Sequence, residues 1–132
     1  MRLYPPAWGM PRESIEADEI MGYHIPPKSA IVLGQFLTHR HPEFWEGPDQ
    51  FRPEHFLGEA PANRPRFAYF PFGGGPRVCI GSQFAMIEAQ LVLATVIQRY
   101  EMDLVADHPV VLDPTFTLRP KYGVKVTLRE RG

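Results

Sequence analysis

Residues 72–81 are Phe-Gly-Gly-Gly-Pro-Arg-Val-Cys-Ile-Gly, and this stretch decides the interpretation of the chain. It contains the only cysteine, Cys79, which follows three glycines and a proline and precedes a long apolar run. Glycines allow positive φ and carry no side chain, so the backbone here can approach a large ligand closely. Cys79 falls just before a predicted helix, where free N–H groups and the helix dipole favour an anion such as a thiolate. Arg77 adds a guanidinium, which is always charged and whose planar set of N–H donors can bind a carboxylate.

The composition excludes several classes of protein. A length of 132 residues suits one domain, and a hydrophobic content of 44% is ordinary for a globular chain. The net charge of -1, with no basic run, gives no reason to expect a nucleic-acid partner. A single cysteine rules out an internal disulfide and fits a reducing compartment. The chain has no apolar run of about 18 residues, and residues 1–6 are too short for a signal peptide, so neither a membrane segment nor a leader is predicted.

The residues after the cysteine predict one long helix. Residues 82–99 contain no glycine or proline, and apolar side chains recur at helical spacing over most of the surface. A helix that is apolar most of the way round is buried on several sides. The rest of the chain offers only short strands and proline-broken segments to cover it. We therefore expect the chain to be a piece of a larger core.

The other elements are predicted to be short. The 15 prolines and 11 glycines indicate rigid turns in an ordered, poorly helical chain, and residues 37–71 show no sustained period. In the first half of the chain we expect the end of a helix at residues 1–4, a β-hairpin of residues 19–21 and 23–25 around Gly22, and a strand at 29–36. A short helix is expected near Pro42, capped by His41. Residues 115–119 and 124–129 are expected to form a C-terminal β-hairpin, in which the strand 124–129 is half-buried.

Several kinds of site can contain such a cysteine loop. A thiolate beneath a flat macrocycle, with Arg77 on a carboxylate at its rim, describes haem with a cysteine axial ligand. A lone cysteine before an apolar helix is more often a small buried hydrophobe. A phosphate loop needs Gly-Lys-Ser/Thr after the glycines, whereas proline and arginine follow here. Zinc needs several Cys or His at set spacing, and the five histidines are dispersed apart from His39 and His41. A Cys-His nucleophile stays open, because the sequence pairs no particular histidine with Cys79.

The spacing of the residue types in this loop resembles a known signature. Phe72-x-x-Gly75-x-Arg77-x-Cys79-x-Gly81 resembles the haem-binding signature of the cytochrome P450 family. Four other segments resemble motifs of that family, and they occur in the family's order. Arg2-Leu3-Tyr4-Pro5-Pro6 resembles the end of its Glu-x-x-Arg helix, and Pro11-Arg12-Glu13 resembles a propionate-binding stretch. His39-Arg40-His41-Pro42-x-x-Trp45 resembles its His-Arg-Asp-Pro-x-x-Trp segment, and Phe51-Arg52-Pro53-Glu54-His55-Phe56 resembles its Pro-Glu-Arg-Phe motif. The resemblance covers residues 1–132. It implies the family's fold, mainly α with small β-sheets, of which this chain is the C-terminal part of the catalytic domain.

The resemblance implies roles for particular residues. Cys79 is expected to be the axial ligand of haem iron, with Phe72 beside its sulfur. The residues expected to bind haem propionates or to shape the loop are Arg77, Arg12, Gly75 and Gly81. Regions that usually line the substrate pocket correspond to Trp8, Gly9, Met10, Thr115 and Phe116, for which core packing is the alternative.

By the same resemblance, the complete protein is expected to be a bacterial, cytoplasmic haem-thiolate monooxygenase; a membrane anchor upstream stays open. It would insert one atom of O₂ into an apolar organic substrate, with electrons from a ferredoxin, a flavodoxin or a reductase. Two alternatives stay open: a haem-thiolate isomerase or reductase, and a non-catalytic haem-binding remnant.

The chain departs from the family pattern at four points. The Glu of Glu-x-x-Arg would precede Met1, and the family's distal helix with its acidic-Thr pair is not in these residues. His55 stands where a second arginine often lies, and His41 replaces an aspartate. Arg64 and Arg66 are expected to be solvated loop charges; the alternative is that they form, with Arg77, a docking surface for an acidic electron donor.

Overall fold

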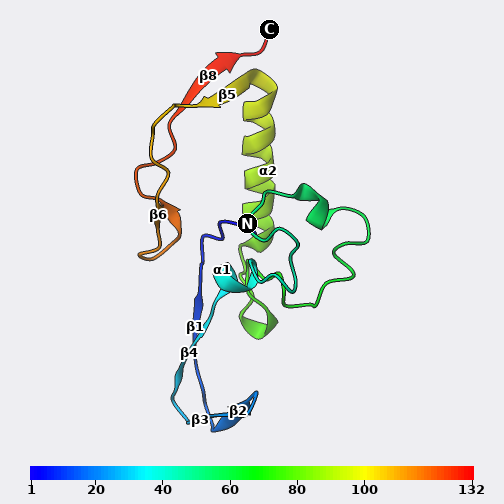
Figure 1. Cartoon of the computed structure of the whole chain (residues 1–132), viewed down its shortest axis with the longest axis vertical. Helices are drawn as coiled ribbons and strands as arrows, with labels where there is room; N and C mark the ends of the chain where they lie inside the picture. The colour runs from blue at the N-terminus through cyan, green and yellow to red at the C-terminus, as the bar shows by residue number, and fades with distance from the viewer. The chain divides into compact units, whose positions relative to one another are not determined.

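The computed structural model describes all 132 residues as two compact units, Met1–Pro71 and Phe72–Gly132, each of which we describe by itself. Each unit contains two small two-stranded antiparallel sheets, and the only long helix, α2, lies in the second unit (Figure 1).

The first unit begins with two sheets, and the strands of the second, β2 (Asp18–Ile20) and β3 (Tyr23–Ile25), lie in sequence between the two strands of the first, β1 (Met10–Glu13) and β4 (Ala30–Leu33). Strand β1 pairs with β4, and β2 pairs with β3. The two residues between β2 and β3, Met21 and Gly22, both have positive φ, at 51° and 84°. Such a turn matches the twist of the flanking strands, which confirms the hairpin predicted around Gly22.

Three predictions for this unit are wrong. The strand expected at 29–36 ends at Leu33, because Gly34 begins the one-turn helix α1 (Gln35–Thr38). Residues 1–4 are not helical, since an α-helical hydrogen bond joins residues four apart and these residues can form none among themselves. Near Pro42 there is a single turn, in which the Trp45 N–H donates to the His41 carbonyl at 3.1 Å, and no helix continues from it.

The core of the first unit is small and aromatic. Trp45 and Ala68 are buried, at 1% and 2% exposure, and the polar side chains of Arg2, Gln35 and His39 are buried with them. The remaining element of this unit is the 3-10 turn η1 (Pro53–Phe56), which Pro53 begins. The rings of Phe56 and Tyr69 lie near Trp45, with centroids 5.8 and 6.0 Å from it.

In the second unit, the predicted long helix is confirmed. After the 3-10 turn η2 (Gly75–Arg77), α2 runs from Ser82 to Arg99. The strands are β5 (Tyr100–Leu104), β6 (Leu112–Asp113), β7 (Arg119–Pro120) and β8 (Val126–Glu130).

The predicted pairing of the C-terminal strands is wrong. Strand β8 pairs with β5, directly after α2, and β7 pairs with β6, so residues 115–119 do not form a hairpin with 124–129. In the observed register Glu101 lies opposite Arg129, whose guanidinium contacts Glu101 at 3.3 Å and Asp103 at 2.8 Å. The predicted half-burial of the last strand is also wrong, because all five residues of β8 are exposed.

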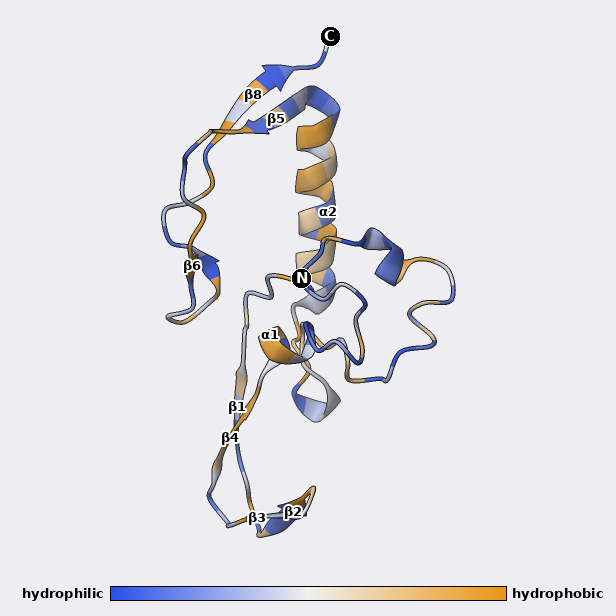
Figure 2. Cartoon of the chain, in the orientation of Figure 1, coloured by the Kyte–Doolittle hydropathy of each residue, from blue (hydrophilic) through white to orange (hydrophobic).

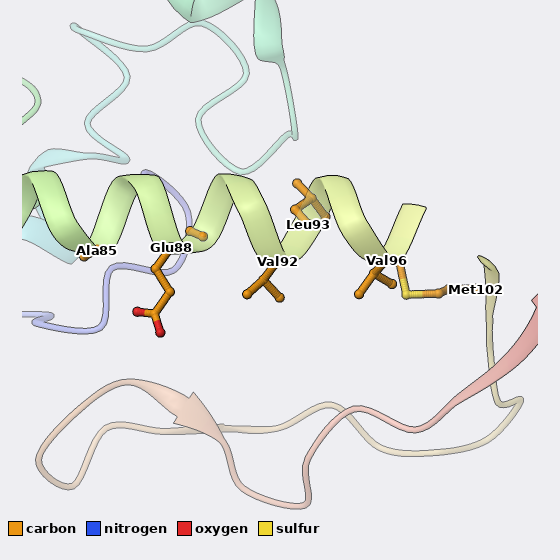
Figure 3. A pocket seen from close by; sticks show the side chains of 7 residues that line it. Ala85, Glu88, Val92, Leu93, Val96 and Met102 are labelled. Carbon is orange, nitrogen blue, oxygen red and sulfur yellow. The ribbon is translucent and has the colours of Figure 1, made fainter. Parts of the chain in front are cut away.

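The predicted burial of α2 is not seen within these 132 residues. None of its residues is buried, and Phe84 and Leu91 are 73% and 63% exposed. Figure 2 shows hydrophobic residues along most of its length. Figure 3 shows Val92 and Val96 pointing toward one open side, where a hollow of about 430 Å³ lies. The hollow is lined by Ala85, Glu88, Ala89, Val92, Leu93, Val96 and Met102. The apolar helix has the composition of a core element, but the elements needed to cover it are not among these residues. No helix of the structure is both long enough and apolar enough to cross a membrane.

Candidate functional site: the cysteine loop

The loop before α2 is held in shape by backbone hydrogen bonds. The Cys79 N–H donates to the Phe72 carbonyl at 2.9 Å, and the Val78 N–H donates to the Gly75 carbonyl at 3.1 Å. Gly73 and Gly75 have φ of 77° and 69°, which side chains other than glycine rarely adopt. The run of glycines therefore lets residues 72–79 close into a loop that brings Phe72 and Cys79 together.

Cys79 lies at the beginning of α2. Gly81 is the N-cap of the helix, with no side-chain capping bond, and its carbonyl accepts from the Ala85 N–H at 2.9 Å. The Cys79 carbonyl accepts from the Ser82 N–H at 3.3 Å. The cysteine is exposed and forms no disulfide. A thiolate at this position would lie beside the positive end of an 18-residue helix, which favours the anion.

The space around the thiol suits a large flat ligand. A side chain built at Gly75 would meet nothing within 4 Å, and one at Gly81 would meet only the Cys79 Sγ, at 3.9 Å. The neighbouring side chains are exposed and apolar: Val78 is 53% exposed and Ile80 is fully exposed. A soft thiolate donor on an open apolar surface is a chemically reasonable site for a haem iron. No group of three or more His, Cys, Asp or Glu side chains gathers elsewhere as a metal site.

The two arginines predicted to bind propionates are both exposed. Arg77 ends η2, two residues before Cys79, and forms no hydrogen bond or ion pair, so its guanidinium is free to bind an anion. Arg12 lies on β1 in the first unit, opposite Ile31 of β4, and its Nη1 donates only to the neighbouring Pro11 carbonyl at 2.8 Å.

The residues predicted to line a substrate pocket belong to both units. In the first unit, Trp8 is 39% exposed, and its carbonyl accepts from the Phe36 N–H at 3.1 Å. Gly9 follows it, where a Cβ would come within 3.0 Å of the Val32 side chain, so a larger residue would push β1 from β4. Met10 begins β1, opposite Leu33.

The other two predicted pocket residues, Thr115 and Phe116, lie between β6 and β7 in the second unit. Phe116 is 90% exposed. Thr115 donates from its N–H and its hydroxyl to Asp113, and these hydrogen bonds lower the pKa of that carboxyl. Both roles of Phe116, pocket lining and core packing, stay predictions, because its ring contacts no core within these residues.

The sequence interpretation missed a buried cluster around Trp45. The Arg64 guanidinium lies 3.7 Å from the Trp45 ring centroid, and the Arg2 guanidinium lies 4.9 Å from it. Arg2 Nη1 donates to the carbonyls of His39 and Pro48 at 2.9 and 2.6 Å, and Nη2 donates to the Gln50 carbonyl at 2.5 Å. Arg64, expected to be a solvated loop charge, is half-buried here. The available sequence signal was Trp45 in the His-Arg-His-Pro-x-x-Trp segment, because the face of an indole ring attracts a guanidinium.

His39 connects this cluster to the segment that leads into the cysteine loop. Its ring is fully buried, and its Nε2 accepts from the Phe70 N–H at 2.9 Å. Burial is the main reason that the pKa of His39 falls from 6.5 to about 4. The imidazole is therefore neutral at pH 7, with its proton on Nδ1. Phe70 lies two residues before Phe72, so this bond fixes the backbone just before the loop.

Comparison with known proteins identifies the group to which this arrangement belongs. The profile described as Cytochrome P450 matches residues 1–128. The protein described as "Putative cytochrome P450 132" of Mycobacterium tuberculosis is 42% identical over 130 residues, which are 98% of this chain and 28% of that protein. The Cyclooctatin synthase of Streptomyces melanosporofaciens is 41% identical over 127 residues, and Thromboxane-A synthase of Rattus norvegicus is 35% identical over 133.

Solved structures agree with the sequence relatives. A structure titled "Retinoic acid bound cyanobacterial CYP120A1" matches with a TM-score of 0.92 and 35% identity, over 98% of this chain and 31% of that one. The cytochrome P450DA heme domain also gives 0.92, at 30% identity, over 99% of this chain and 29% of that one. The chain thus spans between 25% and 28% of the length of these curated relatives.

Proposed function

This chain belongs to the cytochrome P450 family, and on that basis we propose that it is the C-terminal, cysteine-bearing part of the catalytic domain of a haem-thiolate monooxygenase. Members of this family bind haem and share the fold found here, with small antiparallel sheets and few helices in this part. The observation that carries the proposal is the exposed Cys79 at the beginning of α2, in a loop whose glycines leave open space beside it.

Cys79 would hold the iron through its thiolate. Haem, when bound, supplies the oxygen chemistry, and a cysteine ligand favours O–O cleavage. The residues of this chain have a different task, which is to keep the sulfur anionic and in place. The α2 N-terminus stabilises negative charge near Cys79, and the bond from its N–H to Phe72 keeps the cysteine backbone fixed.

Charged and apolar side chains of both units would orient the cofactor. Arg77 has no partner in the structure, so its planar fork can bind a propionate bidentately. Arg12 is proposed for a second propionate, on the basis of its motif position and its exposed guanidinium. Phe72 is proposed to pack beside the sulfur and limit its contact with water.

The activity of the whole protein is proposed from the family. The substrate would be an apolar organic molecule, contacted in part by Trp8, Gly9, Met10, Thr115 and Phe116. The reaction would consume O₂ and two electrons, and the electrons would come from a ferredoxin, a flavodoxin or a reductase.

The ligand assignment is tested spectroscopically in the full-length polypeptide that carries this segment. The reduced carbon monoxide complex of the native sequence should show the red-shifted Soret band of thiolate ligation. Cys79→Ser should abolish that band, whereas Ser82→Ala, a matched change in the first turn of α2, should leave it in place. An unshifted band in the native protein, or a shifted band that persists in Cys79→Ser, would refute the assignment.

A further inference from the structure

The loop between β6 and β7 has little backbone hydrogen bonding to hold it. Residues 114–118, Pro-Thr-Phe-Thr-Leu, join the two strands, which pair over only two residues each. No backbone–backbone hydrogen bond forms within residues 114–118. A loop on so short a sheet opens easily unless other contacts oppose it. Any fixed conformation of this loop therefore depends on side chains.

The Asp113 carboxylate supplies contacts to both ends of the loop. Its Oδ1 accepts from the Thr115 N–H at 3.2 Å and also from the Thr115 hydroxyl. Its Oδ2 accepts from Nε and Nη2 of Arg119, both at 3.3 Å. The side chain of Asp113 is 20% exposed, whereas that of Arg119 is 68% exposed. Both carboxylate oxygens thus accept from donors on opposite sides of the loop.

These contacts form a clamp made of Asp113, Thr115 and Arg119. A carboxylate that accepts from the backbone two residues later closes a tight turn, and Pro114 within that turn has a fixed φ. Arg119 lies opposite Asp113 in the register of β6 and β7, so their ion pair closes the base of the loop. Hydrogen bonds to an ionised acceptor are stronger than neutral ones. The clamp therefore fixes the chain on both sides of Phe116.

The clamp gives different tasks to two residues proposed for the substrate pocket. The single hydroxyl proton of Thr115 is donated to Asp113, so only the methyl group of Thr115 is left for an apolar molecule. Phe116 follows directly, and its ring is 90% exposed. An aromatic ring that is already held in place binds an apolar ligand without the cost of being ordered first.

We propose that Asp113 is a positioning residue for substrate selection. Through Thr115 and Arg119 it holds residues 114–118 in one conformation, and it thereby fixes where Phe116 meets an apolar substrate. Asp113 itself contacts neither substrate nor haem in this role. The inference rests on the proposed function for the substrate contact of Phe116, whereas the clamp involves only residues of this chain.

Amide hydrogen exchange tests the clamp without haem or substrate. In the full-length polypeptide, a peptide containing residues 114–119 should exchange several-fold faster in Asp113→Ala than in the native protein. Thr115→Ser keeps a hydroxyl donor and should keep the native rate, whereas Thr115→Val should exchange faster. The unfolding temperature should change little in any of these variants, because an exposed ion pair contributes little to global stability.

A matched control is available in the neighbouring sheet of the same unit. Asp103 contacts Arg129 at 2.8 Å across β5 and β8, and both side chains are exposed. Asp103→Asn therefore removes a comparable ion pair that does not close the loop. This variant should exchange as the native protein does over residues 114–119.

Ligand binding to the haem-loaded, full-length protein tests the role in selection. Imidazole and 4-phenylimidazole both bind a haem iron through a ring nitrogen, but only the second adds an apolar ring. The ratio of their dissociation constants, measured from the Soret shift, reports the preference for an apolar ligand. Asp113→Ala should lower that preference several-fold, and Phe116→Ala should lower it too. Asp113→Ala should have no further effect in a Phe116→Ala background, since Asp113 acts through Phe116.

The outcomes separate this inference from the proposed haem binding. Unchanged exchange in Asp113→Ala, or equally fast exchange in Asp103→Asn, would overturn the clamp even if Cys79 binds haem. The positioning role is wrong if Phe116→Ala leaves the preference unchanged, or if Asp113→Ala lowers it equally with and without Phe116. If the native protein holds no haem, the proposed function fails, and the exchange rates alone decide whether Asp113 fixes the loop.

Discussion

The buried His39 makes a quantitative prediction about acid stability. Its pKa in the folded protein is about 4, against an ordinary value of 6.5, chiefly because the ring is buried. The charges of Arg2 and Arg40 act in the same direction, since they disfavour a third cation. Protonation at Nε2 would also remove the acceptor for the Phe70 N–H. The folded state therefore requires the neutral ring.

The sign and size of the effect follow from linkage. The folded pKa lies below the unfolded one, so the stabilisation is fully present above pH 6.5 and is lost as the pH falls toward 4. With these two values, the loss between pH 7 and pH 5 is about 2 kcal/mol, and it approaches about 3 kcal/mol at still lower pH. A loss of this size is a large part of the stability of an ordinary domain.

The assay is urea unfolding of the full-length polypeptide at pH 7 and pH 5, with His39→Gln as the test variant. The glutamine amide oxygen can accept from Phe70 but does not titrate, so this variant should lose about 2 kcal/mol less than the native protein over the same range. His24→Gln, at an exposed position on β3, controls for loss of a histidine and should match the native protein. Equal acid losses in the native protein and in His39→Gln would refute the argument.

Four further changes have expected results. Trp45→Ala should cost about 3–5 kcal/mol in urea unfolding, because the side chain is 1% exposed, and unchanged stability would contradict its core role. Gly75→Ala meets open space but has φ of 69°, so it should cost only about 1 kcal/mol of backbone strain, measured as a small drop in the unfolding midpoint. Arg129→Ala should cost less than about 1 kcal/mol, and the difference should vanish at high salt, since its ion pairs are exposed. Residues 1–132 alone should unfold without a sharp transition in near-UV circular dichroism, because α2 has no cover; a cooperative transition would show this prediction to be wrong.

Local features were predictable from the sequence because their causes are local. The start of α2 follows from Gly81 and from the run without glycine or proline that begins at Ser82. The β2–β3 hairpin follows from Gly22, which allows the positive φ that its turn requires. The strand β5 was missed although its residues, Tyr-Glu-Met-Asp-Leu, alternate with period two, because the end of the helical pattern concealed its start.

Pairings between distant residues were not predictable, because nothing in one segment specifies its partner. The strand β8 was assigned to the nearest candidate in sequence, but it pairs with β5, where Arg129 meets two acidic side chains. Arg64 could not be distinguished from a solvated loop charge, since its position depends on Trp45, nineteen residues earlier.

The cysteine loop was determined by the sequence alone. The glycines that permit its turns, the cysteine and the start of α2 all lie within residues 72–82, and their interactions act over a few bonds. Only the tertiary structure showed what fixes the chain just before the loop: the hydrogen bond from the Phe70 N–H to His39, and the Arg2 and Arg64 guanidiniums at Trp45. These contacts join residues up to 43 positions apart in the sequence, from Arg2 to Trp45. They form because burial makes an unpaired polar group costly, and that cost depends on which residues the fold brings together.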